Sequence, residues 1–176
     1  MNSAVATTPS MTWRERFTDR WQARLLIAVV VLSISLPLAA RFSIGIDSQD
    51  EPCLPWRVYL IDTWANPGER GTLVAYRTHG LQFREDGTIY VKKLVGMPGD
   101  QYVGNAESMT INGQHWADLM PAIKTRLGWP SDAFRRDGRL MNDQYLLGGT
   151  APTSYDSRYW GPVNRADLIG RAYPIW

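Results

Sequence analysis

The sequence has almost no cysteine. Cys53 is the only one among 176 residues, which excludes an internal disulfide and a Cys-x-x-Cys redox motif. A lone thiol is an inert buried group, a partner in an intermolecular disulfide or a reactive group. Pro52 and Pro55 bracket it and force an extended, irregular backbone, so the thiol is presented on a constrained loop.

Excess charge is also missing. The formal net charge is +2 and charged residues make up 20% of the chain, so nothing indicates nucleic acid as a partner. Aromatic residues, in contrast, are abundant. Eight Trp and eight Tyr suit a β-rich body and also a surface near a membrane interface.

Residues 25–40 contain no charged residue. The run falls slightly short of the roughly 20 residues that span a bilayer, but residues 42–46 extend its apolar face and Arg41 can snorkel toward the lipid headgroups. Arginines precede the run and are scarce after it. The positive-inside rule then predicts a single-pass anchor, with the N-terminus in the cytoplasm and the body on the outer side of the membrane.

A cleaved secretory signal is the alternative to an anchor, since Ala39 and Ala40 could form a cleavage site. The long basic segment before the run and Pro37 near the cut favour the uncleaved anchor. In both cases the body is exported. The expected organisation is a cytoplasmic segment over 1–24, a membrane anchor over 25–46 and a periplasmic domain over 47–176.

The exported body has the pattern of antiparallel β structure. Short β-branched and aromatic runs alternate with turn signals, and Asn112-Gly113 is a strong hairpin signal. Residues 117–143 break the rhythm and are interpreted as an insertion that caps the substrate, with a short helix within 117–127 and an exposed charged loop over 135–139. The expected strands cover residues 57–61, 72–76, 89–95, 102–103, 109–111 and 144–147.

Two adjacent lysines, Lys92 and Lys93, lie on the strand predicted over 89–95, just before a Pro-Gly-Asp turn. Successive strand side chains point to opposite faces, so one lysine can face the protein body while the other faces water. Burial disfavours the charged amine, which would suit a general base. A surface pair on an edge strand is the alternative, and alternation alone does not choose between the two lysines.

Three features now stand together: the thiol loop, the lysine strand and a cluster from Ser154 to Arg158. They resemble the type I signal peptidase family, and Cys53-x-Pro55 with the short lead-in to the Asp-Ser-Arg-Tyr block resembles its TraF-type branch of conjugative transfer peptidases. The matching blocks are Val91-Lys92-Lys93-Leu94-Val95-Gly96-Met97-Pro98-Gly99-Asp100, Met109-Thr110-Ile111-Asn112-Gly113, Tyr155-Asp156-Ser157-Arg158-Tyr159-Trp160-Gly161-Pro162-Val163 and Gly170-Arg171-Ala172.

The resemblance implies a mostly β, signal-peptidase-like body and a role for each matching residue. Lys92 matches the general base, and Lys93 matches a neighbouring structural position. Ser154 matches the hydroxyl that orients the lysine, while Asp156 and Arg158 match a bracing pair. No metal ion and no cofactor are implied.

Cys53 stands where the family has its nucleophilic serine. A thiol ionises more readily than a hydroxyl, so a Cys-Lys pair can react as thiolate and ammonium. The oxyanion hole is expected to use the Cys53 backbone N–H and an unidentified second donor, because the ionised carboxylate of Glu51, two residues earlier, cannot donate.

The resulting hypothesis is a membrane-anchored peptidase that cleaves an exported pilin precursor of a conjugative type IV secretion system. An acyl-enzyme on Cys53 would be resolved by water or by the substrate's own N-terminal amine, which would give a cyclic pilin. The expected partners are the precursor or another exported protein and inner membrane lipid. The alternative is an inactive peptidase fold that serves as a scaffold for pilus assembly.

Overall fold

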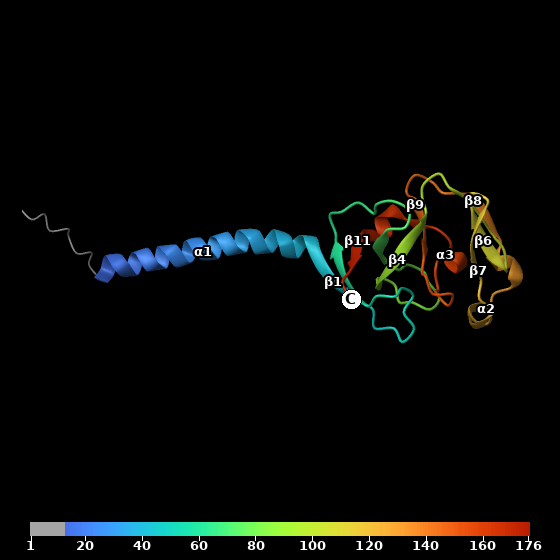
Figure 1. Ribbon diagram of the computed structural model, residues 1–176, viewed down its shortest axis with the longest axis horizontal. Coiled ribbons are helices and arrows are strands. Elements are labelled where there is room, and N and C mark those ends of the chain that lie inside the picture. Colours follow the sequence, from blue (N-terminus) through green and yellow to red (C-terminus); the bar gives the residue numbers. More distant parts are fainter. Residues whose placement is uncertain (1–12) are drawn as a thin grey trace, which may run out of the picture. The chain divides into compact units, whose positions relative to one another are not determined.

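The computed structural model describes the backbone of residues 13–176 and the side chains from residue 20 onward. The chain divides into two compact units, residues 1–40 and 41–176. Helix α1 covers Trp13–Arg41 (Figure 1). Within it, the 22 residues Arg20–Arg41 are long and apolar enough to cross a membrane, and an 18-residue window among them has a mean hydropathy of 2.2. The predicted N-terminal apolar helix is therefore present.

The helix ends at Arg41, earlier than the anchor boundary expected at residue 46. Phe42–Ile46 instead forms strand β1, which pairs antiparallel with β2 (Val58–Asp62). Arg41 itself bonds the Asp62 carboxylate through two nitrogens at 3.0 and 2.6 Å. Apolar residues with alternating spacing suit a strand as well as a membrane helix, and the ladder with β2 decides in favour of the strand.

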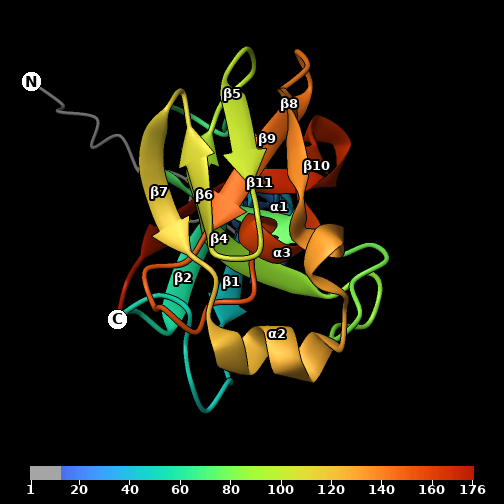
Figure 2. The ribbon, with the colours of Figure 1, turned by 90° about the vertical axis from the view of Figure 1, so that its right-hand side faces the viewer.

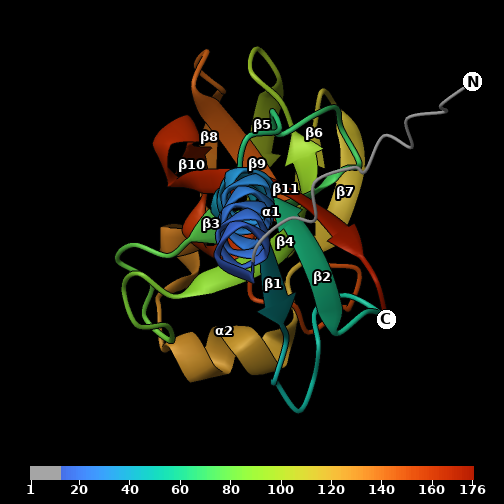
Figure 3. The ribbon, with the colours of Figure 1, turned by 90° about the vertical axis from the view of Figure 1, so that its left-hand side faces the viewer.

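The body is built around a seven-stranded antiparallel sheet in the order β1-β2-β11-β3-β4-β9-β10. Figure 3 shows the side on which β1 and β2 lie next to each other. The fold class predicted from the sequence, mostly antiparallel β, is confirmed. The remaining strands are β3 (Leu73–Arg77), β4 (Ile89–Gly96), β9 (Gln144–Gly148), β10 (Val163–Asn164) and β11 (Leu168–Pro174).

A second sheet of four strands has the order β7-β6-β5-β8 and faces the viewer in Figure 2. Its β6–β7 hairpin turns at Asn112 and Gly113, both with positive φ, as the sequence predicted. The prediction of an exposed loop over 135–139 is wrong in part. The last four of these residues form strand β8, which pairs with β5. Edge strands often carry charges that discourage further pairing. The charged sequence of β8 therefore resembles that of an exposed loop. The strands are β5 (Gln101–Gly104), β6 (Ser108–Ile111), β7 (Gln114–Asp118) and β8 (Arg136–Arg139).

The predicted short helix is present as α2 (Pro121–Leu127) and begins later than residue 117, because Ala117 still belongs to β7. Pro121 occupies the first helical position, where its missing N–H costs nothing. Gly128 ends the helix in the left-handed conformation, with its N–H donating to the Lys124 carbonyl. The other helices are η1 (Ser131–Phe134), α3 (Ser157–Trp160) and η2 (Arg165–Asp167).

Asp100 fixes the corner at which β4 leaves the large sheet and the chain enters the small one. Its carboxylate accepts hydrogen bonds from the Met97 N–H at 2.6 Å, from the Asn112 side chain at 2.7 Å and from Arg70 at 2.6 Å. Burial raises the pKa of Asp100, but these donors outweigh burial and lower it overall. The Pro-Gly-Asp block is therefore a structural joint between the two sheets.

Gly170, on β11, offers a stability test because the backbone of the β2 end lies against it. A Cβ at this position would lie 2.2 Å from the Asp62 carbonyl oxygen and 2.8 Å from Thr63 Cα. We expect Gly170→Ala to destabilise the protein by about 3 kcal/mol, because backbone atoms cannot step aside as side chains do. Chemical unfolding of the detergent-solubilised chain measures the loss.

The matched control is Gly45→Ala on β1. There the new Cβ would meet Ile61 Cδ1 at 3.0 Å, the end of a flexible side chain that can rotate. A loss below about 1 kcal/mol is expected. Equal effects of the two substitutions would contradict the close approach at Gly170.

Candidate active site

Cys53 lies on the loop before β2, and the residue is 7% exposed. Its carbonyl oxygen accepts hydrogen bonds from the Thr150 N–H at 2.9 Å and the Ala151 N–H at 3.2 Å. The loop that follows β9 therefore holds the residue that carries the thiol, across a separation of 97 positions in the sequence.

The other end of the thiol loop is held by Tyr59, on β2. Its hydroxyl donates to the Trp56 carbonyl at 2.6 Å. Burial raises the pKa of Tyr59 to about 12, so the phenol remains a hydrogen-bond donor at neutral pH. Together with the prolines at 52 and 55, this contact limits the movement of Cys53.

Lys92 is the inward lysine of β4. It is 2% exposed and shares its strand face with the fully buried Leu94, whereas Lys93 is only half-buried. The prediction that one of the two lysines faces the body is confirmed. The Lys92 amine donates to Ser154 Oγ at 2.7 Å, and no ion pair involves it among the residues whose side chains are described. A hydroxyl, not a carboxylate, thus holds the buried amine.

Asp156 and Arg158 form a buried ion pair at 2.8 Å, with side chains 0% and 5% exposed. A second bond of 2.8 Å joins Arg158 Nη2 to the other carboxylate oxygen. Burial lowers the pKa of Arg158, but its bonds with Asp156 outweigh burial and raise it overall. Removing one partner of such a pair typically lowers the free energy of unfolding by about 3–5 kcal/mol. The folded protein is therefore expected to keep both partners in contact.

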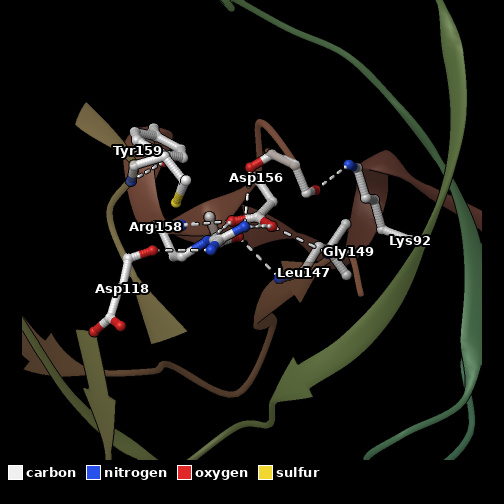
Figure 4. A network of polar contacts seen from close by, with 10 residues as sticks. Lys92, Asp118, Leu147, Gly149, Asp156, Arg158 and Tyr159 are labelled. Carbon is white, nitrogen blue, oxygen red and sulfur yellow. Dashed lines mark hydrogen bonds and ion pairs between the residues drawn. The ribbon is translucent and has the colours of Figure 1, made fainter. Parts of the chain in front are cut away.

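The Asp156–Arg158 pair acts on both ends of the loop over residues 149–154 (Figure 4). Asp156 accepts from the Gly149 N–H at 3.0 Å, and Arg158 donates to the Ser154 carbonyl at 3.0 Å. Because this loop also contacts the Cys53 carbonyl and Lys92, the ion pair positions both candidate catalytic residues without contacting either through a hydrogen bond.

Sequence reasoning missed Gly149, at the start of the same loop. A Cβ there would lie 2.3 Å from Ser154 Oγ and 2.7 Å from the Cys53 carbonyl oxygen. Only glycine therefore allows the loop to approach both residues. The pair Gly148-Gly149 at a strand end was the available signal, because glycine in such a position often marks close backbone approach.

For the peptide cleavage that the family resemblance implies, we expect Gly149→Ala to lower kcat/KM about 100-fold, since displacements near 1 Å at a catalytic centre can have effects of this size. Steady-state cleavage of a fluorogenic peptide measures the loss. Thr150→Ala is the control, because the backbone N–H that reaches Cys53 remains, and its effect should stay within about threefold. A Gly149→Ala enzyme with normal kinetics would contradict the tight packing of this loop.

A cavity of about 550 Å³ opens beside Cys53. The Cys53 backbone N–H makes no hydrogen bond to any described residue, which leaves it free to stabilise an oxyanion. The lining side chains of Ser48, Gln49 and Thr153 carry further O–H and N–H donors. The cavity is lined by Ser48, Gln49, Asp50, Glu51, Cys53, Phe83, Arg84, Ile123, Arg126, Thr153 and Tyr155.

The chain is similar to several proteins that are named as signal peptidases. A crystal structure of a signal peptidase I from Enterococcus faecalis V583 aligns with 61% of this chain and 97% of its own, at 22% identity and a TM-score of 0.38. A protein from Leptolyngbya laminosa named signal peptidase I is 28% identical over 111 residues, which cover 61% of this chain and 52% of that protein.

Two further matches cover nearly the whole chain. A protein from Synechocystis sp. named "Probable signal peptidase I-2" is 31% identical over 172 residues, which cover 94% of this chain and 73% of that protein. The family described as signal peptidase, peptidase S26, matches residues 18–176. The chain belongs to this family.

Proposed function

We propose that the chain is a membrane-anchored endopeptidase in which Cys53 is the nucleophile and Lys92 the base. One observation carries the proposal: the loop over residues 149–154 bonds both the Cys53 carbonyl and the buried Lys92 amine. The same loop therefore holds the residue that carries the thiol and the residue that carries the amine, which supports their action as a pair. Ser154 would orient the amine, and Asp156 with Arg158 would hold the loop.

The proposed reaction proceeds through an acyl-enzyme. The thiol proton passes to Lys92, the Cys53 sulfur attacks the scissile carbonyl carbon, and the Cys53 N–H stabilises the developing oxyanion. The C–N bond then breaks, and the departing amine takes up the proton that Lys92 holds. Water or another amine gives a proton to Lys92 as it attacks the thioester carbonyl, the C–S bond breaks, and this proton returns to the sulfur and restores the thiol.

An extended substrate segment has a place to pair along β4. Strand β9 pairs with β4 only from Lys93 onward, so in the described chain the edge of residues 89–92 that faces away from β3 has no strand partner. Backbone pairing at a free edge binds peptides with little demand on their sequence. It would bring the substrate backbone beside Lys92.

The organisation of the chain follows from α1. We propose that its apolar segment anchors the enzyme in the bacterial inner membrane, with residues 1–24 in the cytoplasm and the β body, which begins at β1, in the periplasm. The arginines before the apolar run support this orientation. Cleavage would then occur close to the outer face of the membrane.

We propose a pilin precursor as the substrate, because the sequence resembles the TraF-type branch of the family. A thioester reacts with amines in preference to water more strongly than an oxygen ester does, so Cys53 favours joining of the substrate ends. Mass spectrometry of the mature substrate tests this. A cyclic product lacks one water relative to the linear one, and a linear product from the wild-type enzyme would rule cyclisation out.

The second candidate is a non-catalytic scaffold that has lost the serine of its family. The low exposure of Cys53 favours it, since a buried thiol can be inert. To separate the two, the full chain is reconstituted in lipid vesicles with an exported precursor, before and after treatment with iodoacetamide. Cleavage that iodoacetamide blocks supports the enzyme, whereas absence of cleavage with intact pilus assembly in cells supports the scaffold.

A further inference from the structure

The cavity beside Cys53 contains charged side chains that the proposed mechanism does not use. Asp50 and Glu51 directly precede the thiol loop and are exposed, and neither carboxylate has a hydrogen bond or an ion pair with the described residues. Their backbone is nevertheless held, because Arg57 donates to the Gln49 carbonyl at 2.7 Å and to the Asp50 carbonyl at 3.4 Å. The backbone just before the thiol loop is thus held, while both carboxylates remain unpaired among the described residues.

Arg84 also lines the cavity and contacts Gln49, the residue that precedes these carboxylates. It donates to the Gln49 side chain at 2.7 Å and to the Phe83 carbonyl at 3.1 Å, and it lies over the Tyr90 ring at 5.1 Å. All three partners are neutral, so Arg84 keeps its charge and offsets one of the two carboxylates. This acidic side, made of Asp50, Glu51 and Arg84, keeps a net charge of about −1.

Arg126 supplies a positive charge from α2. Its guanidinium lies over the Phe83 ring at 4.4 Å, a contact that restrains the side chain without neutralising it. No carboxylate within the described chain pairs with it. The apolar surfaces of Phe83, Ile123 and Tyr155 also line the cavity, and such low-dielectric walls strengthen the interaction of a bound charge with its partners.

We infer that this cavity selects its substrate by charge polarity: a basic residue of the bound segment faces Asp50 and Glu51, and an acidic residue faces Arg126. The inference rests on the proposed function, since it assumes that the cleaved segment binds beside Cys53. It adds a selection by charge, and it names the residues that decide which exported proteins are cleaved well.

The test uses peptides that share one scissile sequence and differ in the positions of a single Lys and a single Glu. Values of kcat/KM are measured for the full chain in lipid vesicles. The wild-type enzyme should prefer one polarity about tenfold over the reversed one, because each solvent-accessible charge contact contributes up to about fivefold. High salt should reduce the preference.

Charge-reversal variants assign the preference to these residues. Glu51→Lys and Arg126→Glu should each weaken it, and the double variant should favour the reversed peptide. The matched control combines Glu107→Lys with Arg135→Glu, which changes two exposed charges that line another cavity and should leave the preference unchanged. The inference is overturned if the wild-type enzyme cleaves peptides of both polarities equally well. It is also overturned if the double variant keeps the wild-type polarity preference.

Binding measurements separate this inference from the proposed function. The same peptides are titrated against the Cys53→Ala variant by fluorescence anisotropy, which requires no catalysis. Polarity-dependent binding without cleavage by the wild type would support charge selection and reject the peptidase. Cleavage without any dependence on polarity would support the peptidase and reject charge selection.

Discussion

Replacing Cys53 by alanine is expected to lower precursor cleavage at least about 1,000-fold, because a proposed acyl transfer then has no nucleophile. Alanine removes one buried sulfur and leaves the backbone contacts from Thr150 and Ala151 to residue 53, so the fold should persist. The rate is measured with a fluorogenic precursor peptide, and thermal unfolding of the variant checks its stability.

Cys53→Ser is the informative companion variant. Serine is the family's usual nucleophile, and Lys92 with Ser154 remains in place to activate it, so we expect cleavage reduced about 10- to 100-fold and not abolished. This variant should also resist iodoacetamide. Full activity of Cys53→Ala would mean that another group attacks the substrate and that Cys53 is a structural thiol.

Local sequence rules could not predict which of the two lysines of β4 is buried. Strand alternation reduced the choice to Lys92 or Lys93, and the family resemblance selected Lys92. The physical reason for the choice is nonlocal: Lys92 pairs in register with Val74 on β3, and the neighbouring inward residue Leu94 packs with Val74 and Leu147 in one buried cluster. No pattern within residues 89–96 contains that information.

The environment of Cys53 was predictable only in part. Its prolines indicate an irregular loop, but the contacts that hold it come from Thr150, far along the chain. Those contacts depend on the packing of Gly149 and on the buried pair of Asp156 and Arg158. Local propensity describes single segments, whereas such a site exists only after distant segments have packed.

In the small sheet, too, one feature was predictable from local sequence and another was not. The Asn112-Gly113 turn defines a local hairpin and was found, while β8 was missed because its partner β5 lies more than 30 positions earlier in the sequence. Charged, exposed residues at an edge strand carry no period-2 apolar signal. Pairing between distant strands, not composition, makes this segment a strand.

Lys92→Met is expected to lower cleavage about 1,000-fold or more, while Lys93→Met should remain within about threefold of the wild type. Methionine fills the buried site with an unbranched side chain of similar length, so the change removes the amine from Ser154 without a large cavity. Lys93 is half-buried and has no hydrogen bond to the 149–154 loop among the described residues. Equal losses for both lysines would place the base elsewhere.

Combining this substitution with Cys53→Ser tests how far a thiol depends on the lysine. A hydroxyl requires a base to attack, whereas a thiol reaches its reactive thiolate with less help. The loss caused by Lys92→Met should therefore be at least about tenfold larger in the Cys53→Ser background than in the wild type. Both losses are obtained from kcat/KM as a double-mutant cycle. Identical losses would mean that Lys92 serves the leaving amine and not the nucleophile, because the proton delivered to that amine is needed by either attacking group.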